Sequence, residues 1–136
     1  MTPEFLQQVL ARAVVRDFFR FAAVGVVATA VHYAVLIALA ELAGVHPVLG
    51  TVCGAISGAV VSYTLNRLYT FTARPAYMRG LAKFFVVIGI GAALNAGIVA
   101  LFMWLGLHYI FAQFIATGLV LIWNFAVSRV VVFREP

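Results

Sequence analysis

The chain has 136 residues, 65% of them hydrophobic and only 10% charged, with a formal net charge of +5. A soluble domain carries about 25% charged residues, so this composition excludes a water-soluble globular fold. The apolar runs are long enough to cross a bilayer as helices, each of which needs about 20 residues. We therefore expect an all-α integral membrane protein. Its basic residues lie at the ends of the apolar runs, which favours membrane lipids and phosphate groups as partners over nucleic acid.

Residues 1–20 are predicted to form a short interfacial helix. Thr2 suits the N-cap, Pro3 the first helical position and Glu4 the first turn. A basic residue then recurs every four positions, at Arg12, Arg16 and Arg20. This spacing is typical of a helix that lies on the membrane with its arginines toward the headgroups. The alternative is a frayed terminus.

Four apolar runs are predicted to span the membrane, and together they make the chain, residues 1–136, a single transmembrane domain. The spans cover about residues 21–42, 47–68, 84–105 and 109–130.

The basic residues are distributed unevenly between the two sides of this predicted topology. All nine lie before the first span, between the end of the second and the start of the third, or from the end of the fourth onward: Arg12, Arg16, Arg20, Arg67, Arg74, Arg79, Lys83, Arg129 and Arg134. The two opposite loops contain no Lys or Arg. By the positive-inside rule we expect both termini and the middle loop to be cytoplasmic, in a multi-pass protein of the cell's inner membrane.

One sequence pattern occurs twice, at Ser62–Phe71 and at Asn124–Phe133. Each copy places an aromatic residue, an arginine and a phenylalanine at i, i+4 and i+8, which is one stripe of a helix. The small polar residues trade places between the copies: Ser62 and Asn66 in the first, Asn124 and Ser128 in the second. Each copy therefore combines a guanidinium, an amide and a hydroxyl at the end of an apolar helix.

The repeat extends to the first helix of each half. Arg20-Phe21 before the first span matches Lys83-Phe84 before the third, and His32 matches Asn95. This predicts two parallel repeated helical hairpins, related by a pseudo-twofold axis along the membrane normal. Small residues spaced by four predict close helix packing, within the chain rather than between chains: Gly50, Gly54 and Gly58, and Gly89, Ala93 and Gly97.

These features resemble the GtrA-like family of small four-span membrane proteins. The resemblance rests on Arg20-Phe21 with Val24-Gly25, on Asn66-Arg67, and on Trp123-Asn124-Phe125 followed by Arg129 and Phe133. It implies a role in cell-surface polysaccharide synthesis. Members are proposed to move polyprenyl-phosphate-linked sugars across the membrane, or to act as membrane partners of glycosyltransferases. The chain departs from the family at Ala28 and His32, where members often carry Asn and an acid.

Arg67 and Arg129 have two interpretations. They anchor the helix ends in the headgroups, or they hold a lipid phosphate, to which the forked guanidinium is better suited than Lys. We favour a lipid-phosphate site, and its expected members are Arg67, Arg129, Asn66, Asn124, Ser62 and Ser128. The two asparagines have alternatives in capping helix ends or bonding between helices.

His32 and Asn95 are expected near mid-membrane, where polar side chains are functional candidates by default. We favour a structural role, a hydrogen bond between the two repeats, and expect Gln113 and Thr117 to join helices as well.

No catalytic constellation is apparent, since the acids Glu4, Asp17, Glu41 and Glu135 lie near ends or loops and the histidines lack metal-ligand spacing. We expect a non-enzyme without metal or cofactor. The first hypothesis is a translocase for a polyprenyl-phosphate-linked monosaccharide. The alternative is a non-catalytic subunit that recruits or orients a polyprenyl-phosphate glycosyltransferase, and a homodimer is a further option because one chain is small for shielding a sugar.

Overall fold

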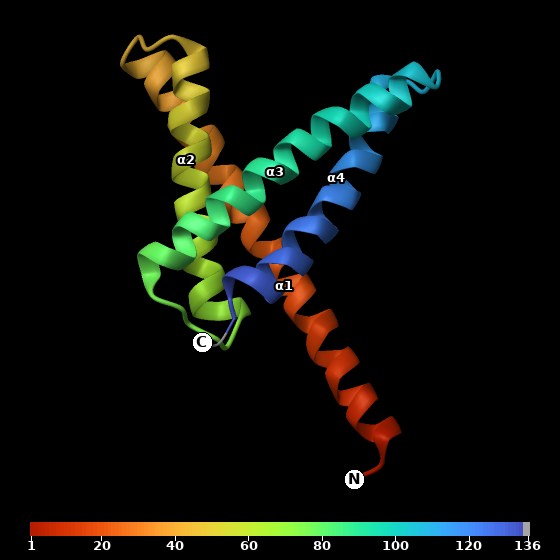
Figure 1. Ribbon diagram of the computed structural model, residues 1–136. Coiled ribbons are helices and arrows are strands. Elements are labelled where there is room, and N and C mark those ends of the chain that lie inside the picture. Colours follow the sequence, from red (N-terminus) through yellow and green to blue (C-terminus); the bar gives the residue numbers. More distant parts are fainter. Residues whose placement is uncertain (135–136) are drawn as a thin grey trace. The chain divides into compact units, whose positions relative to one another are not determined.

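The computed structural model describes residues 1–134, and these residues form helices joined by short connections, with no strand among them (Figure 1). The α-helices are α1 (Pro3–Ile37), α2 (Pro47–Leu65), α3 (Tyr77–Trp104) and α4 (Tyr109–Val127). Three π-helical segments continue α1, α2 and α4 respectively: η1 (Ala38–Leu42), η2 (Asn66–Thr70) and η3 (Ser128–Val132).

All four helices, taken with their π-helical continuations, are long and apolar enough to cross a membrane. The shortest have 24 residues, at Pro47–Thr70 and Tyr109–Val132, which exceeds the roughly 20 residues that a bilayer requires. The predicted all-α membrane fold with four spanning helices is confirmed.

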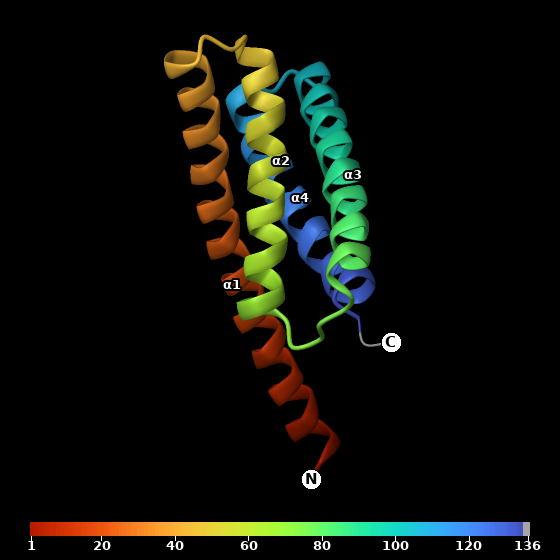
Figure 2. The same ribbon diagram turned by 90° about the vertical axis from the view of Figure 1, so that its left-hand side faces the viewer.

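The chain divides into two compact units between Thr72 and Ala73. Each unit is one helical hairpin: α1 packs against α2 in the first, and α3 against α4 in the second. Figure 2 shows α2 running alongside α1. The division falls between the two sequence repeats, so each repeat folds as one hairpin.

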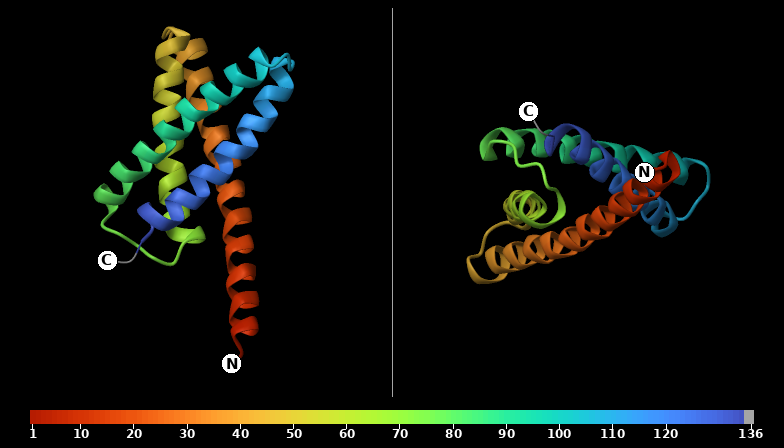
Figure 3. Two further views of the ribbon diagram at one scale, coloured as in Figure 1. Left: turned by 45° about the vertical axis from the view of Figure 1, so that its right-hand side comes forward. Right: turned by 90° about the horizontal axis from the view of Figure 1, so that it is seen from below.

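The start of α1 follows the sequence prediction. The hydroxyl oxygen of Thr2 accepts a hydrogen bond from the Phe5 N–H at 3.3 Å, Pro3 is the first helical residue and Glu4 lies in the first turn. The helix then continues unbroken past residue 20, because no glycine or proline lies between Pro3 and Gly25 to interrupt its hydrogen bonds. The predicted N-terminal helix is therefore continuous with the first span, and it extends past the end of α2 (Figure 3). Its interfacial position stays a prediction.

The turns within the two hairpins are built alike. Gly44 and Gly106 occupy corresponding positions and have φ angles of 67° and 94°, a region that only glycine enters readily. Two residues later, the Nδ1 atoms of His46 and His108 accept the N–H groups of Val48 and Ile110, both at 3.2 Å. These two histidines therefore cap the N-termini of α2 and α4.

Glycine lets α2 approach the backbone of α1. A Cβ atom at Gly54 would lie 2.6 Å from the carbonyl oxygen of His32, and one at Gly58 would lie 2.8 Å from that of Ala28. Both separations are too short for any real side chain, so the helix contact requires glycine at these positions. The expected packing within the chain is confirmed for this stripe.

The second hairpin makes its close contact with alanine. Ala112 and Ala116 stand where the first hairpin has Gly50 and Gly54, and both are fully buried. Small residues at this spacing therefore form the buried stripe of both second helices. These alanines have no distinct signal in the sequence, because alanine is common throughout the apolar runs.

At the third position of the stripe, the glycine lies on the second helix of the first hairpin but on the first helix of the second hairpin. The first hairpin has Gly58 on α2 against Ala28 on α1. The second hairpin has Val120 on α4, and its partner position on α3 is Gly91, where a Cβ atom would lie 3.2 Å from a methyl group of Val120. The exchange keeps the combined side-chain volume small enough for close packing in both hairpins.

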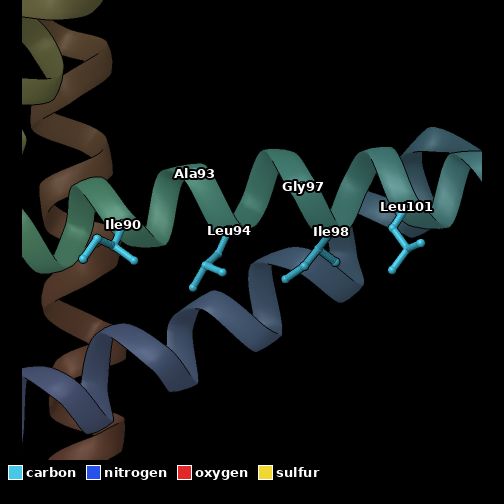
Figure 4. A pocket seen from close by; sticks show the side chains of 6 residues that line it. All are labelled: Ile90, Ala93, Leu94, Gly97, Ile98 and Leu101. Atoms are coloured by element: carbon cyan, nitrogen blue, oxygen red, sulfur yellow. The ribbon is translucent and has the colours of Figure 1, made fainter.

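The predicted stripe on α3 does not pack within its own hairpin. A Cβ atom at Gly89 or Gly97 would meet no atom within 4 Å among the residues that the structure describes. Figure 4 shows the side chains that line a shallow apolar groove of about 320 Å³ on this helix, formed by Ile90, Ala93, Leu94, Gly97, Ile98 and Leu101.

Candidate lipid-phosphate site

Both copies of the repeated motif end in a π-helical turn. The N–H of Phe71 bonds to the carbonyl of Asn66 at 3.0 Å, and the N–H of Phe133 bonds to that of Ser128 at 2.8 Å. Each bond spans five residues instead of the four of an α-helix. Such turns are rare and occur frequently at functional sites. They contain Arg67 in η2 and Arg129 in η3, and both side chains are half-buried.

A pair of phenylalanines closes the same end of each hairpin. The rings of Phe21 and Phe71 meet edge to face with their centres 6.2 Å apart, and those of Phe84 and Phe133 do so at 6.5 Å. All four residues are buried. Each pair ties the first helix of its hairpin to the residue that follows the π turn, and so fixes the position of the turn.

In the first hairpin, three polar side chains form a hydrogen-bonded chain along the end of α2. The amide nitrogen of Asn66 donates to the Ser62 hydroxyl at 3.3 Å, and the Thr70 hydroxyl donates to the Asn66 carbonyl at 2.7 Å. Asn66 is fully buried. Because both ends of its amide are bonded within its own helix, Asn66 is placed to shape the turn that carries Arg67.

The second hairpin lacks this chain. Val132 replaces the threonine, and the buried hydroxyl of Ser128 has no hydrogen-bond partner among the described residues of its hairpin. The carbonyl oxygen of Asn124 is likewise buried and without such a partner. Leaving a buried polar atom unpaired costs about 1–3 kcal/mol, so these two atoms are candidates for contact with a ligand or with water.

Asn124 and Trp123 also belong to the contact between α3 and α4. A Cβ atom at Gly91 would collide with the Asn124 carbonyl oxygen, so Asn124 requires glycine opposite it. The indole N–H of Trp123 donates to the carbonyl of Val87 at 3.3 Å. The motif Trp123-Asn124 thus has a packing role as well as a place beside η3.

Arg20 contacts η2, which continues α2, and this role was not expected from the sequence. Its Nη1 donates to the carbonyl of Tyr69 at 3.3 Å, which satisfies a helix C-terminus and suits the helix dipole. Arg20 and Tyr69 line a groove of about 450 Å³, together with Ala23, Val24 and Leu68. A guanidinium has five donors, so Arg20 adds a cation to this end of the first hairpin. The sequence signal that could have indicated this role is the repeated basic–Phe pair, Arg20-Phe21 and Lys83-Phe84.

Asp17 is buried, although the sequence analysis grouped it with acids at chain ends and loops. It is 7% exposed, the only buried acid among the described residues, and it pairs with Arg16 at 3.2 Å. A buried carboxylate needs such compensation. Asp17 lies three residues before Arg20, so the two side chains share one face of α1.

The residues predicted to lie near mid-membrane have partners within their own hairpins. Asn95 on α3 and Gln113 on α4 exchange two amide hydrogen bonds, of 3.4 and 3.0 Å. His32 stacks on Tyr33 with ring centres 5.6 Å apart and lies against Gly54. Asn95 thus bonds to the other helix of its own hairpin, and the expected hydrogen bond between the repeats stays a prediction.

The six expected site residues thus lie at the equivalent ends of two hairpins: Ser62, Asn66 and Arg67 in the first, and Asn124, Ser128 and Arg129 in the second. The meeting of Arg67 and Arg129 at one phosphate stays a prediction.

Two helical hairpins with polar, arginine-bearing π turns define a small multi-pass membrane protein with an internal repeat. A family model described as the GtrA/DPMS transmembrane domain matches residues 20–133. The chain belongs to this family, as the resemblance in its sequence indicated. Membership associates it with lipid-linked sugar processes in the membrane. The match starts at Arg20 within α1 and ends at Phe133, just after η3, so it covers both hairpin repeats.

Proposed function

We propose that the protein is a translocase for a polyprenyl-phosphate-linked monosaccharide in cell-surface polysaccharide synthesis. The observation that carries the proposal is the duplicated π turn. Each hairpin places an arginine in such a turn, Arg67 in η2 and Arg129 in η3, beside buried polar side chains.

A lipid phosphate is the ligand that suits these turns best. Guanidinium groups bind phosphate oxygens through paired, charge-assisted hydrogen bonds. In this proposal Arg67 and Arg129 contact the phosphate, and the Ser128 hydroxyl and Asn124 amide supply further hydrogen bonds. Ser62 and Asn66 hold the first turn in shape.

The duplicated architecture supports movement of the lipid, because parallel structural repeats recur in transporters that bind substrate where the repeats meet. The protein itself supplies no chemistry in this proposal. Its partners are the lipid-linked sugar and membrane lipids. We place it in the inner membrane with both termini in the cytoplasm, so that the arginines face the side on which sugar lipids are made.

The alternative function is a non-catalytic subunit that recruits or orients a glycosyltransferase. It is favoured by the N-terminal part of α1, which precedes the family match and extends past the end of α2 (Figure 3). Most of its side chains are exposed, including Phe5, Leu6, Leu10 and Arg12. An enzyme or a second copy of this chain would find apolar and basic groups there.

Reconstitution of the purified protein alone separates the two functions. A fluorescent short-chain polyprenyl-phosphate hexose is placed in one leaflet of liposomes, and its arrival in the other leaflet is measured. We expect faster movement than in protein-free liposomes, and slower movement with Arg67→Lys but not with the matched control Arg12→Lys. No acceleration by the protein would contradict the translocase. Stimulation of a co-reconstituted glycosyltransferase would then support the alternative.

A further inference from the structure

A second polar cluster lies away from the arginines, on the second hairpin. The Gln113 amide nitrogen donates both to the carbonyl of Asn95 and to the hydroxyl of Thr117, each at 3.0 Å. The Asn95 amide returns a bond to Gln113 at 3.4 Å. Gln113 and Thr117 are exposed, and Asn95 is half-buried.

This cluster retains unused hydrogen-bonding capacity. Each primary amide has two N–H donors and two acceptor lone pairs. The hydrogen bonds within the cluster leave Asn95 one N–H and leave both amide oxygens a lone pair. An exposed amide facing hydrocarbon is unfavourable, so the cluster is expected to face a polar ligand or water.

A groove with aromatic walls adjoins the cluster. It has a volume of about 510 Å³ and is lined by Val99, Tyr109, Ile110, Gln113, Phe114 and Thr117. Tyr109 and Phe114 are 58% and 73% exposed, and the ring of His108 lies against that of Tyr109 with the centres 4.5 Å apart. Exposed rings beside neutral donors and acceptors therefore share one concave surface.

We propose that this groove binds the sugar of the lipid-linked substrate, an inference that rests on the proposed translocase function. Sugar hydroxyls both donate and accept hydrogen bonds, as the Asn95–Gln113–Thr117 cluster does, and the C–H face of a sugar ring packs on an aromatic ring. The groove contains no cationic side chain, so it suits the hydroxyl groups of the sugar rather than its phosphate.

The distance between the groove and the arginines indicates at which stage of translocation the sugar would occupy the groove. Gln113 and Arg129 are separated by 16 residues along α4 and η3, or about 24 Å at the α-helical rise of 1.5 Å per residue. A single sugar cannot reach both places at once. The groove is therefore a receiving site, which the sugar enters after it has crossed from the arginine end.

The first hairpin has no such cluster. The repeat positions of Asn95, Gln113 and Thr117 are occupied there by His32, Thr51 and Ala55. Each chain accordingly has one sugar site although it has two arginine turns, and Thr51 provides a matched position for control variants.

The test compares a polyprenyl-phosphate hexose with the sugar-free polyprenyl phosphate in the same liposomes. We expect Gln113→Met to slow movement of the hexose lipid by about twofold to tenfold, the effect of losing one neutral hydrogen bond, and to leave movement of the sugar-free lipid unchanged. Thr117→Val should act in the same direction, whereas Thr51→Val, the same change at the control position, should have no effect.

The outcomes separate this inference from the proposed function. Equal slowing of both lipids by Gln113→Met and Thr117→Val would show that the cluster only stabilises the hairpin, and unchanged movement of the hexose lipid in both variants would remove the sugar site; either result overturns the inference. Failure of the wild-type protein to move either lipid would refute the translocase, and the sugar site with it. That failure appears in the wild-type measurement, before any variant is compared.

Discussion

At the scale of single residues, the close packing of helices in each hairpin depends on glycines, which have no side chain. Gly54 and Gly58 let α2 touch the carbonyl groups of α1, while Gly91 makes room for the side chain of Asn124. Lipid offers no hydrophobic drive for helices to associate. Close packing at these few positions is therefore a main source of hairpin stability.

Substitution of Gly54 tests this dependence. Gly54→Ala places a methyl group 2.6 Å from a backbone oxygen of α1, and such overpacking costs about 1–3 kcal/mol. Thermal unfolding of the purified protein in detergent should show a lower midpoint. The matched control is Gly89→Ala, where the new Cβ would meet nothing within 4 Å; we expect a change within about 0.5 kcal/mol. Equal stability of the two variants would contradict the packing account.

At the scale of elements, the two π turns differ in how their polar groups are satisfied. In η2 the Thr70 hydroxyl completes the chain through Asn66 to Ser62. In η3 valine replaces threonine and the Ser128 hydroxyl stays unpaired among the described residues of its hairpin. The first turn is therefore held internally, and the second has polar groups left for a ligand.

Thr70→Val should loosen the first turn. The substitution keeps the side-chain shape but leaves the buried Asn66 carbonyl oxygen without this donor, at a cost of about 1–3 kcal/mol. Hydrogen exchange at the Phe71 amide, which closes the turn, should speed up accordingly. Thr29→Val is the control, because that hydroxyl only bonds the carbonyl of Gly25 in its own helix. Unchanged exchange at Phe71 would mean that the π turn does not depend on the polar chain.

The elements that the sequence predicts well are those with a strong local signal. Apolar run length defines the four helices, and Thr2-Pro3-Glu4 defines the start of α1. The stripe on α2 has three glycines at one spacing, which also made its packing predictable. The stripe on α3 has small residues at the same spacing, but its two glycines contact nothing among the described residues of the hairpin. The spacing identifies a helix face made of small residues and does not identify the helix that packs on it.

The equivalent positions of the two motif arginines were predictable, but the hydrogen bonds around them were not. Arg67 and Arg129 lie at equivalent helix ends, as the repeat implied. The π turns were not foreseen, since both motifs also fit an α-helix. The pairing of Asn95 with Gln113 was missed because the repeat pointed to His32, and a repeat relates equivalent positions without showing which of them touch.

At the scale of the whole molecule, every Lys and Arg is assigned to the cytoplasmic side by the sequence. This predicts that both termini are cytoplasmic. Tags at each terminus should be cleaved by protease only after the inner membrane is opened, whereas a tag inserted at Gly44, in the turn between α1 and α2, should be accessible from outside. Cleavage of either terminal tag from outside would show that the protein has the opposite orientation, with the arginines on the side away from the cytoplasm.

The central prediction is that Arg67 and Arg129 bind the same lipid phosphate. Binding of a short-chain polyprenyl phosphate should be measured for the wild type, Arg67→Lys, Arg129→Lys and the double variant. Lys retains the charge but loses the fork, and a charge-assisted hydrogen bond contributes about 1.5–3 kcal/mol. Each single change should then weaken binding by about tenfold to a hundredfold. Because the two arginines share a ligand, the double variant should lose less than the sum of the single losses. Equal affinities in all four proteins would contradict the claim and leave both arginines as membrane anchors.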